Sequence, residues 1–209
     1  MSRELTKEQS ARLLATFRMP FPQTMMSRKS SITNAFVNAL IPVVEPTATE
    51  IEEALEILGM DCDSIRCAYC GNVFTEWDHL RPLVMNRRPT GFISEIANLV
   101  PACAKGNQSK GNKNWRTWME SEATHSPTRR GIRDIEQRIE RLQAFEAWRK
   151  VEPLPFEQMM GAEDYAKYWS MLDTTIDELR KCQEFADALK RRIAEAHSKH
   201  LSKSSSQSS

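Results

Sequence analysis

The residues best suited to chemistry lie in the middle of the chain, where an acid and a histidine are adjacent at Asp78 and His79. Asn98 and Asn107 follow them. A histidine, whose unperturbed pKa is about 6.5, can act as a neutral base when an acceptor holds one ring nitrogen. Carboxylate and amide oxygens are ligands that Mg²⁺ and Mn²⁺ prefer. The set therefore has groups that can bind a divalent cation and take a proton from water.

Cysteines make up a second set in the same stretch. Cys67 and Cys70 form a Cys-x-x-Cys pair, and Cys103 precedes Asn107. The chain has five cysteines, an odd number, and its N-terminal residues are charged where a signal peptide would be apolar. This pattern favours metal ligation or free thiols over a disulfide framework.

In order and approximate spacing, these residues resemble the HNH family of nucleases over about residues 62–120. The resemblance implies a ββα unit that clasps one divalent metal. The acid–histidine pair would lie at the end of the first strand and Asn107 at the start of the helix. It implies that His79 is the general base, that the Asn98 amide carbonyl accepts the ring N–H of His79, and that Asp78 and Asn107 bind Mg²⁺ or Mn²⁺.

Family members with a Cys-x-x-Cys pair often carry a second pair before the helix, and the four thiolates hold a structural zinc. Here the second pair reads Cys103-Ala-Lys-Gly106, so the fourth thiolate is absent. Cys67, Cys70 and Cys103 remain as zinc ligands, with Cys62 or water as the fourth. The alternative is that these cysteines are small core residues.

Positive charge is concentrated around the same residues. From Asp78 to Arg116 the net charge is +5, whereas the rest of the chain carries −4. Such a local field favours phosphate binding, although a solvated charged surface is the alternative. Lys110, one helical turn beyond Asn107, is expected to contact the phosphate backbone. The expected DNA-binding residues are Arg81, Arg87, Arg88, Lys105, Lys110 and Lys113.

Helices are expected on both sides of this centre. Two capping boxes, Thr6 with Gln9 and Thr47 with Glu50, mark helix starts, and Gly59 is a C-cap candidate. Between about Asp61 and Pro101 the helical period fails, and short apolar runs between turn residues predict a hairpin-like β segment. The first helix is expected to face the protein core with an apolar stripe made of Leu5, Leu13, Leu14 and Phe17.

Two apolar seams near the C-terminus predict two long helices, one containing Ile132, Ile135, Ile139 and Leu142 and the other Ile176, Leu179, Leu189 and Ile193. They would pair with each other as a hairpin or form a homodimer seam. The predicted fold class is α+β. Its parts are an N-terminal helical region (1–60), an HNH ββα-metal unit (61–122), a C-terminal helical hairpin (123–200) and a disordered serine-rich tail (201–209).

The whole chain fits a cytoplasmic protein. It has 209 residues, a net charge of +1 and 40% hydrophobic residues, enough for one core with appended lobes. No apolar run reaches the roughly 18 residues of a membrane span. The function predicted is a metal-dependent endonuclease that cuts double-stranded DNA, sequence-specific and of restriction or defence type. The alternative is a non-catalytic, zinc-finger-like nucleic-acid-binding module.

Overall fold

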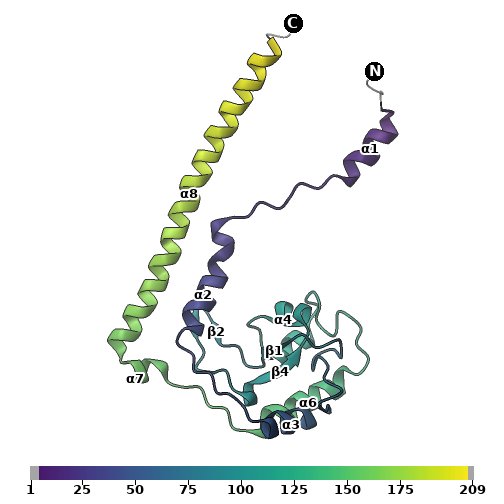
Figure 1. The fold of residues 1–209 in the computed structure, drawn as a ribbon, viewed down its shortest axis with the longest axis vertical. Helices are drawn as coiled ribbons and strands as arrows, with labels where there is room; N and C mark the ends of the chain where they lie inside the picture. Colours follow the sequence, from purple (N-terminus) through teal and green to yellow (C-terminus); the bar gives the residue numbers. More distant parts are fainter. Residues whose placement is uncertain (1–4, 207–209) are drawn as a thin grey trace. The chain divides into compact units, whose positions relative to one another are not determined.

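The computed structural model describes residues 5–206, which form helices and a small amount of β structure (Figure 1). The fold is therefore α+β, as predicted. The helices are α1 (Lys7–Thr16), α2 (Lys29–Asn38), α3 (Ala48–Ile57), α4 (Ala104–Lys110), α5 (Trp115–Met119), α6 (Ile135–Trp148), α7 (Phe156–Met160) and α8 (Ala162–Ser206), with 3-10 turns η1 (Met25–Arg28) and η2 (Ile96–Asn98). The strands are β1 (Glu76–His79), β2 (Val84–Met85), β3 (Arg88–Pro89) and β4 (Leu99–Ala102).

Contacts divide the chain into two units. We call Ser30–Thr175 the central unit, and Met1–Lys29 together with Ile176–Ser209 the terminal unit. Helix α8 contributes residues to both. No helix in the described part of the chain has the length and apolar character needed to cross a bilayer.

The sequence signals for α3 are confirmed. The Thr47 side chain accepts a hydrogen bond from Glu50 N, and the Glu50 carboxylate accepts one from Thr47 N. Gly59 follows the helix at φ 70°, a conformation that glycine adopts readily. Ala54, Leu55 and Leu58 are buried, so this helix packs one face into the core.

Helix α1 begins at the predicted capping box but does not pack as predicted. Thr6 and Gln9 form the reciprocal cap. Leu13, Leu14 and Phe17, however, are 54%, 76% and 66% exposed, and Leu5 is exposed as well. The expected core-facing stripe is therefore wrong, because no described residue of α1 is buried.

Strands β1 and β4 pair antiparallel, with Asp78 opposite Val100 and His79 opposite Leu99. Helix α4 follows β4 after Cys103, and Figure 1 shows β1 beside β4. The predicted hairpin-like segment is only partly right. The two strands are joined by a long excursion that contains its own pair, β2 with β3, instead of a short turn.

The core of the central unit lies between these strands and α3, α5 and α6. It includes Trp115 and Trp118 of α5 and Ile139, Leu142 and Phe145 of α6. Helix α6 packs beside α3 and η2, and its apolar face is used there. The predicted hairpin of two C-terminal helices is therefore wrong, because α6 packs within this core instead of along α8.

Helix α8 buries its first turns in the central unit, where Trp169 and Leu172 are almost fully covered. It continues to Ser206, so residues 201–206 of the predicted disordered tail (201–209) are helical in the structure. Residues 207–209 of that predicted tail lie outside the described residues. A helix that has already begun extends at low cost per residue, and serine is only a moderately poor helix former.

Candidate functional site

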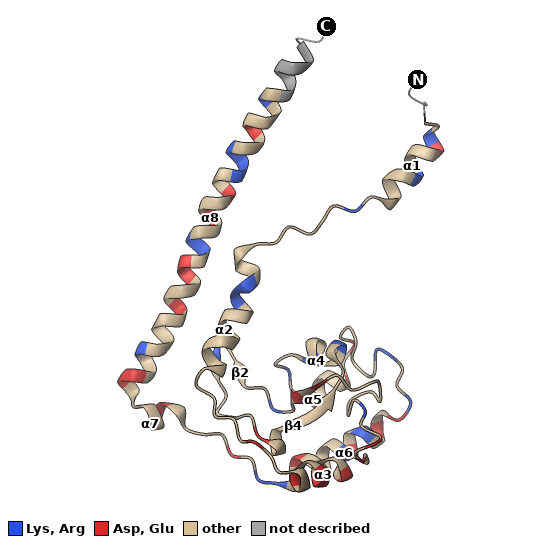
Figure 2. Cartoon of the chain, viewed as in Figure 1, with Lys and Arg blue, Asp and Glu red and all other residues tan. Residues whose placement is uncertain are grey.

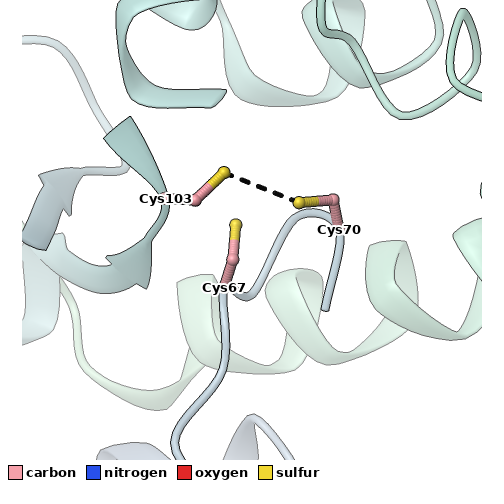
Figure 3. Close-up of side chains that lie close together, drawn as sticks. All are labelled: Cys67, Cys70 and Cys103. Carbon is pink, nitrogen blue, oxygen red and sulfur yellow. Dashed lines mark hydrogen bonds between the residues drawn. The ribbon is translucent and has the colours of Figure 1, made fainter. Parts of the chain in front are cut away.

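Three cysteine side chains lie close together in the core. Cys67 and Cys70 lie in a tight turn, in which Gly71 N donates to Cys67 O at 2.8 Å, and Cys103 lies at the N-cap of α4. The three Sγ atoms are within 4.8 Å of one another, and all three residues are buried (Figure 3). Cys70 Sγ and Cys103 Sγ are 3.7 Å apart. The sequence therefore identified a real cluster.

The cluster favours at least one thiolate. A hydrogen bond from Cys67 lowers the pKa of Cys70, and the Arg130 guanidinium acts in the same direction. The same interaction, together with burial, raises the pKa of Cys67. Thiolates in a buried group suit Zn²⁺, which prefers sulfur ligands in tetrahedral geometry. The donor set and its spacing therefore fit a structural metal.

A fourth cysteine ligand does not come from Cys62, which is exposed and does not belong to the cluster. Gly106 lies close to the cluster. A Cβ atom there would lie 3.2 Å from Cys103 Sγ. Gly106 therefore lies beside Cys103, at the position that the second cysteine of a Cys-x-x-Cys pair would occupy.

Asp78 points into the core and is neutralised by a lysine. Its Oδ2 accepts a 2.6 Å hydrogen bond from the Tyr69 hydroxyl and lies 3.0 Å from Lys110 Nζ. Asp78 is 5% exposed and Lys110 is fully buried. Burial raises the pKa of Asp78 and lowers that of Lys110, while each charge opposes the shift of the other. Lys110 is thus an internal counter-ion, and the expected contact between Lys110 and phosphate is wrong.

His79 ends β1 and is half-buried. Its Nε2 lies 2.8 Å from Ser94 Oγ. Ser94 is itself fixed, because Val44 N donates to its carbonyl and its own N–H donates to Pro42 O. Burial, aided by the positive charge of Lys110, lowers the pKa of His79 to about 4. The imidazole is therefore neutral at pH 7 and held at one nitrogen.

Asn98 is structural. Its Oδ1 accepts a hydrogen bond from Arg81 N, and its Nδ2 donates to Arg81 O and Ile93 O. The expectation that Asn98 holds the His79 ring is wrong, because Ser94 is the partner of that ring. A fully buried amide must satisfy its polar atoms locally, and here the backbone of the β1–β4 connection does so.

Asn107 lies on α4 and donates from Nδ2 to Glu76 Oε1 at 3.0 Å. Alternate residues of a strand share a face, so Glu76 lies on the same face of β1 as Asp78, and His79 can reach that site only because it is the residue at which β1 ends. Sequence reasoning missed Glu76, Tyr69 and Ser94. The two-residue spacing from Asp78 could have indicated Glu76, whereas no local signal indicates Ser94.

These oxygen donors fit a hard divalent cation by type. Glu76 and Asp78 offer carboxylates and Asn107 an amide oxygen. Within the described residues, no hydrogen bond is directed at Asp78 Oδ1 or Asn107 Oδ1. The positive charge of Lys110 beside Asp78 opposes a cation there, so any such ion would bind weakly before phosphate oxygens joined it.

The predicted DNA-binding residues differ in what they contact. Arg81 is mostly buried and donates to Glu146 O, so it is part of the core packing. Arg87 and Arg88 both pair with Asp173. Lys105 and Lys113 are exposed, on and just after α4. The exposed positive charge of the site therefore comes chiefly from this helix region.

Comparisons of the chain with protein-family models, with curated proteins and with solved structures found no match. The functional argument therefore depends on the geometry of the site.

Proposed function

We propose that this protein is a metal-dependent DNA endonuclease that hydrolyses phosphodiester bonds, an HNH-type enzyme of restriction or defence type. The observation that carries the proposal is the state of His79: a neutral imidazole at the end of β1, held at Nε2 by Ser94. A protein that only bound nucleic acid would have no need of a positioned base.

His79 serves as the general base. When Nε2–H donates to Ser94 Oγ, Nδ1 is the nitrogen that accepts a proton from the attacking water. The backbone on both sides of this contact is fixed, since Lys110 Nζ donates to His79 O at 2.7 Å. The ring therefore needs little reorganisation before it reacts.

Glu76, Asp78 and Asn107 would hold the divalent ion from β1 and α4. Bound Mg²⁺ or Mn²⁺ supplies charge neutralisation at the phosphate. Tyr69 and Lys110 hold Asp78 Oδ2 and leave Oδ1 for this role. Such outer hydrogen bonds orient ligating carboxylates in metal sites.

Lys105 and Lys113 are the side chains proposed to contact DNA phosphates, because both are exposed. The three-cysteine cluster is proposed to hold a structural Zn²⁺. It connects the turn at Cys67–Cys70 to the start of α4 at Cys103, and so fixes the helix that carries Asn107.

The test is cleavage of supercoiled plasmid with Mg²⁺ or Mn²⁺ by the wild type, by His79→Ala and by the matched control His197→Ala on exposed α8. We expect His79→Ala to cut about 10² to 10⁴ times more slowly. DNA binding, measured by mobility shift without added Mg²⁺ or Mn²⁺, should stay close to wild type. A His79→Ala protein that cuts at the wild-type rate would refute the assignment.

The ligands are tested by titrating Mn²⁺ against cleavage with Glu76→Gln, Asp78→Ala and Asn107→Ala. Higher Mn²⁺ requirements are expected in all three, and Asp78→Ala should be the most severe because it removes a charge and a ligand. Saturation at the wild-type Mn²⁺ concentration would exclude the residue concerned.

One observation favours the second candidate, a non-catalytic nucleic-acid-binding module. Asp78 is already neutralised by Lys110, as in a site that needs no metal. The same plasmid experiment separates the two functions, since DNA that is shifted but never cut would indicate the binding module.

A further inference from the structure

The terminal unit leaves large apolar side chains in solvent. Every exposed phenylalanine of the described residues belongs to it, namely Phe17, Phe21 and Phe185. On α8, Phe185 and Ile193 are each 67% exposed and Leu189 is 37% exposed. Apolar patches of this kind in a soluble protein mark interaction surfaces.

The exposed apolar residues of distal α8 form one stripe, and their spacing is symmetric about Leu189. At 3.6 residues per turn, one face carries Cys182, Phe185, Leu189, Ile193 and Ala196. Counted outward from Leu189, Phe185 and Ile193 are both four residues away, and Cys182 and Ala196 are both seven. A stripe with this symmetry is complementary to its own copy in antiparallel orientation.

The charges beside the stripe are also symmetric, about position 188, one residue from the centre of the stripe. One flank of the stripe carries the basic residues Lys181, Arg192 and Lys199, and the acidic residues Asp177, Glu184 and Glu195 lie next to them. Figure 2 shows basic (blue) and acidic (red) bands along α8. In an antiparallel pair centred near Leu189, each basic residue comes opposite an acidic residue of the other copy. The pairs are Arg192 with Glu184, Lys181 with Glu195 and Lys199 with Asp177, in addition to the pairs that Lys181 makes with Glu178 and Asp177 makes with Arg180 in the same helix.

We propose that the distal half of α8 is a homodimer interface, in which two copies pair antiparallel about a two-fold axis at Leu189. Leu189 packs on its own copy, Phe185 packs on Ile193, and Cys182 packs on Ala196. A two-fold axis makes such an interface close on itself as a dimer. The proposal is independent of the nuclease assignment, because it uses no residue of the Asp78–His79 site.

The first test is the mass of the full-length protein in solution at concentrations up to about 100 µM. We expect the wild type to approach twice the 24.0 kDa chain mass, and Leu189→Lys to remain monomeric. Asp187→Lys, a lysine placed two residues away on the opposite face, is the matched control and should still dimerise. A monomeric wild type, or a Leu189→Lys protein that dimerises normally, overturns the proposal. Leu189 is partly exposed, so this variant should fold, and circular dichroism checks that it does.

The second test determines the orientation by thiol cross-linking with oxidised glutathione, in a Cys62→Ser background. Antiparallel pairing places position 196 of one copy against Cys182 of the other, so Ala196→Cys should give an inter-chain disulfide. Ala196→Cys with Cys182→Ser should give none. The background protein itself should not cross-link, because its two Cys182 residues lie 14 positions out of register, about 21 Å apart at 1.5 Å per residue. Efficient Cys182 to Cys182 cross-linking would indicate parallel pairing and overturn the proposal.

Discussion

Helix α6 and the distal part of α8 have similar apolar spacing but different surroundings. Ile139, Leu142 and Phe145 of α6 are at most 8% exposed, whereas Phe185 and Ile193 of α8 are each 67% exposed. Helix α6 lies in the central unit, packed beside α3 and over the cysteine turn. The comparison shows that the period of apolar residues predicts which face of a helix is apolar, but not which part of the protein, if any, packs against that face.

The two units also differ in how they use polar groups. The central unit contains a buried ion pair, Asp78 with Lys110, and the Tyr69 hydroxyl donates to the same carboxylate. In the terminal unit, the ion pairs are short-range and exposed, such as Arg180 with Asp177. Exposed pairs of this kind contribute about 0 to 1 kcal/mol to stability, whereas breaking a buried pair costs about 3 to 5 kcal/mol.

The largest expected effect concerns the cysteine cluster. Cys103→Ser should destabilise the protein by about 5 kcal/mol or more if the cluster holds zinc, because metal binding then supplies folding free energy. Cys182→Ser, on exposed α8, is the control and should have little effect. Elemental analysis measures the zinc content, and denaturant unfolding measures the free energy of unfolding. About one zinc per wild-type chain is expected, and a zinc-free, fully folded protein would show that the cysteines only pack.

Removal of the buried ammonium should have the next largest effect. Lys110→Met keeps most of the side-chain volume but leaves Asp78 buried without a counter-charge, so we expect a loss of about 3 to 5 kcal/mol. Lys113→Met, exposed and nearby, should change stability by less than about 0.5 kcal/mol. Urea unfolding of the two variants compares them. Equal stabilities would mean that the Asp78 site is solvated and not part of the core.

Stability should depend on the protonation of His79. Its pKa is about 4 in the folded protein, against the ordinary value of 6.5 for a solvated histidine. Below pH 6.5 His79 binds a proton in the unfolded chain but stays neutral in the folded protein. The contribution of His79 to the free energy of unfolding is therefore complete above pH 6.5 and is lost as the pH falls towards 4. Relative to His79→Gln, the wild type should lose up to about 3 kcal/mol between pH 7 and pH 4. A pH-independent difference would place His79 in solvent.

Completion of the cysteine cluster should strengthen metal binding. Gly106→Cys places a thiol beside Cys103, so zinc affinity should rise at least about tenfold, or 1.4 kcal/mol. Gly106→Ala, which adds only the Cβ atom, is the control. Chelator competition gives the affinity, and stronger thiolate-to-metal absorption of the Co²⁺ form would show the added ligand. If both variants bind alike, position 106 does not face the metal.

The smallest effect is expected at α1. Leu14 is 76% exposed, so Leu14→Ala should change stability by less than about 0.5 kcal/mol. Leu142→Ala, the same change in the fully buried part of α6, should cost about 2 to 5 kcal/mol. Thermal unfolding compares the two. A large loss from Leu14→Ala would mean that α1 is covered in solution.

Features set by nearby residues were predictable from the sequence. The capping boxes at Thr6 and Thr47 and the C-cap at Gly59 involve residues within a few positions of each other, so composition and spacing suffice to indicate them. The cysteine cluster was predicted through the resemblance to HNH proteins that carry paired cysteines, since Cys103 is distant in the chain from Cys67 and Cys70.

Features set by strand register and packing were decided only by the tertiary structure. Lys110 is on one face of a short helix, and whether that face meets solvent or Asp78 depends on how α4 lies against β1. Asn98 likewise pairs with the backbone at Arg81 because η2 and β4 bring it there. A pattern of residue types fixes which groups need partners. Which partners they find, across separations of about twenty or thirty residues, depends on contacts that only the assembled core brings within hydrogen-bonding distance.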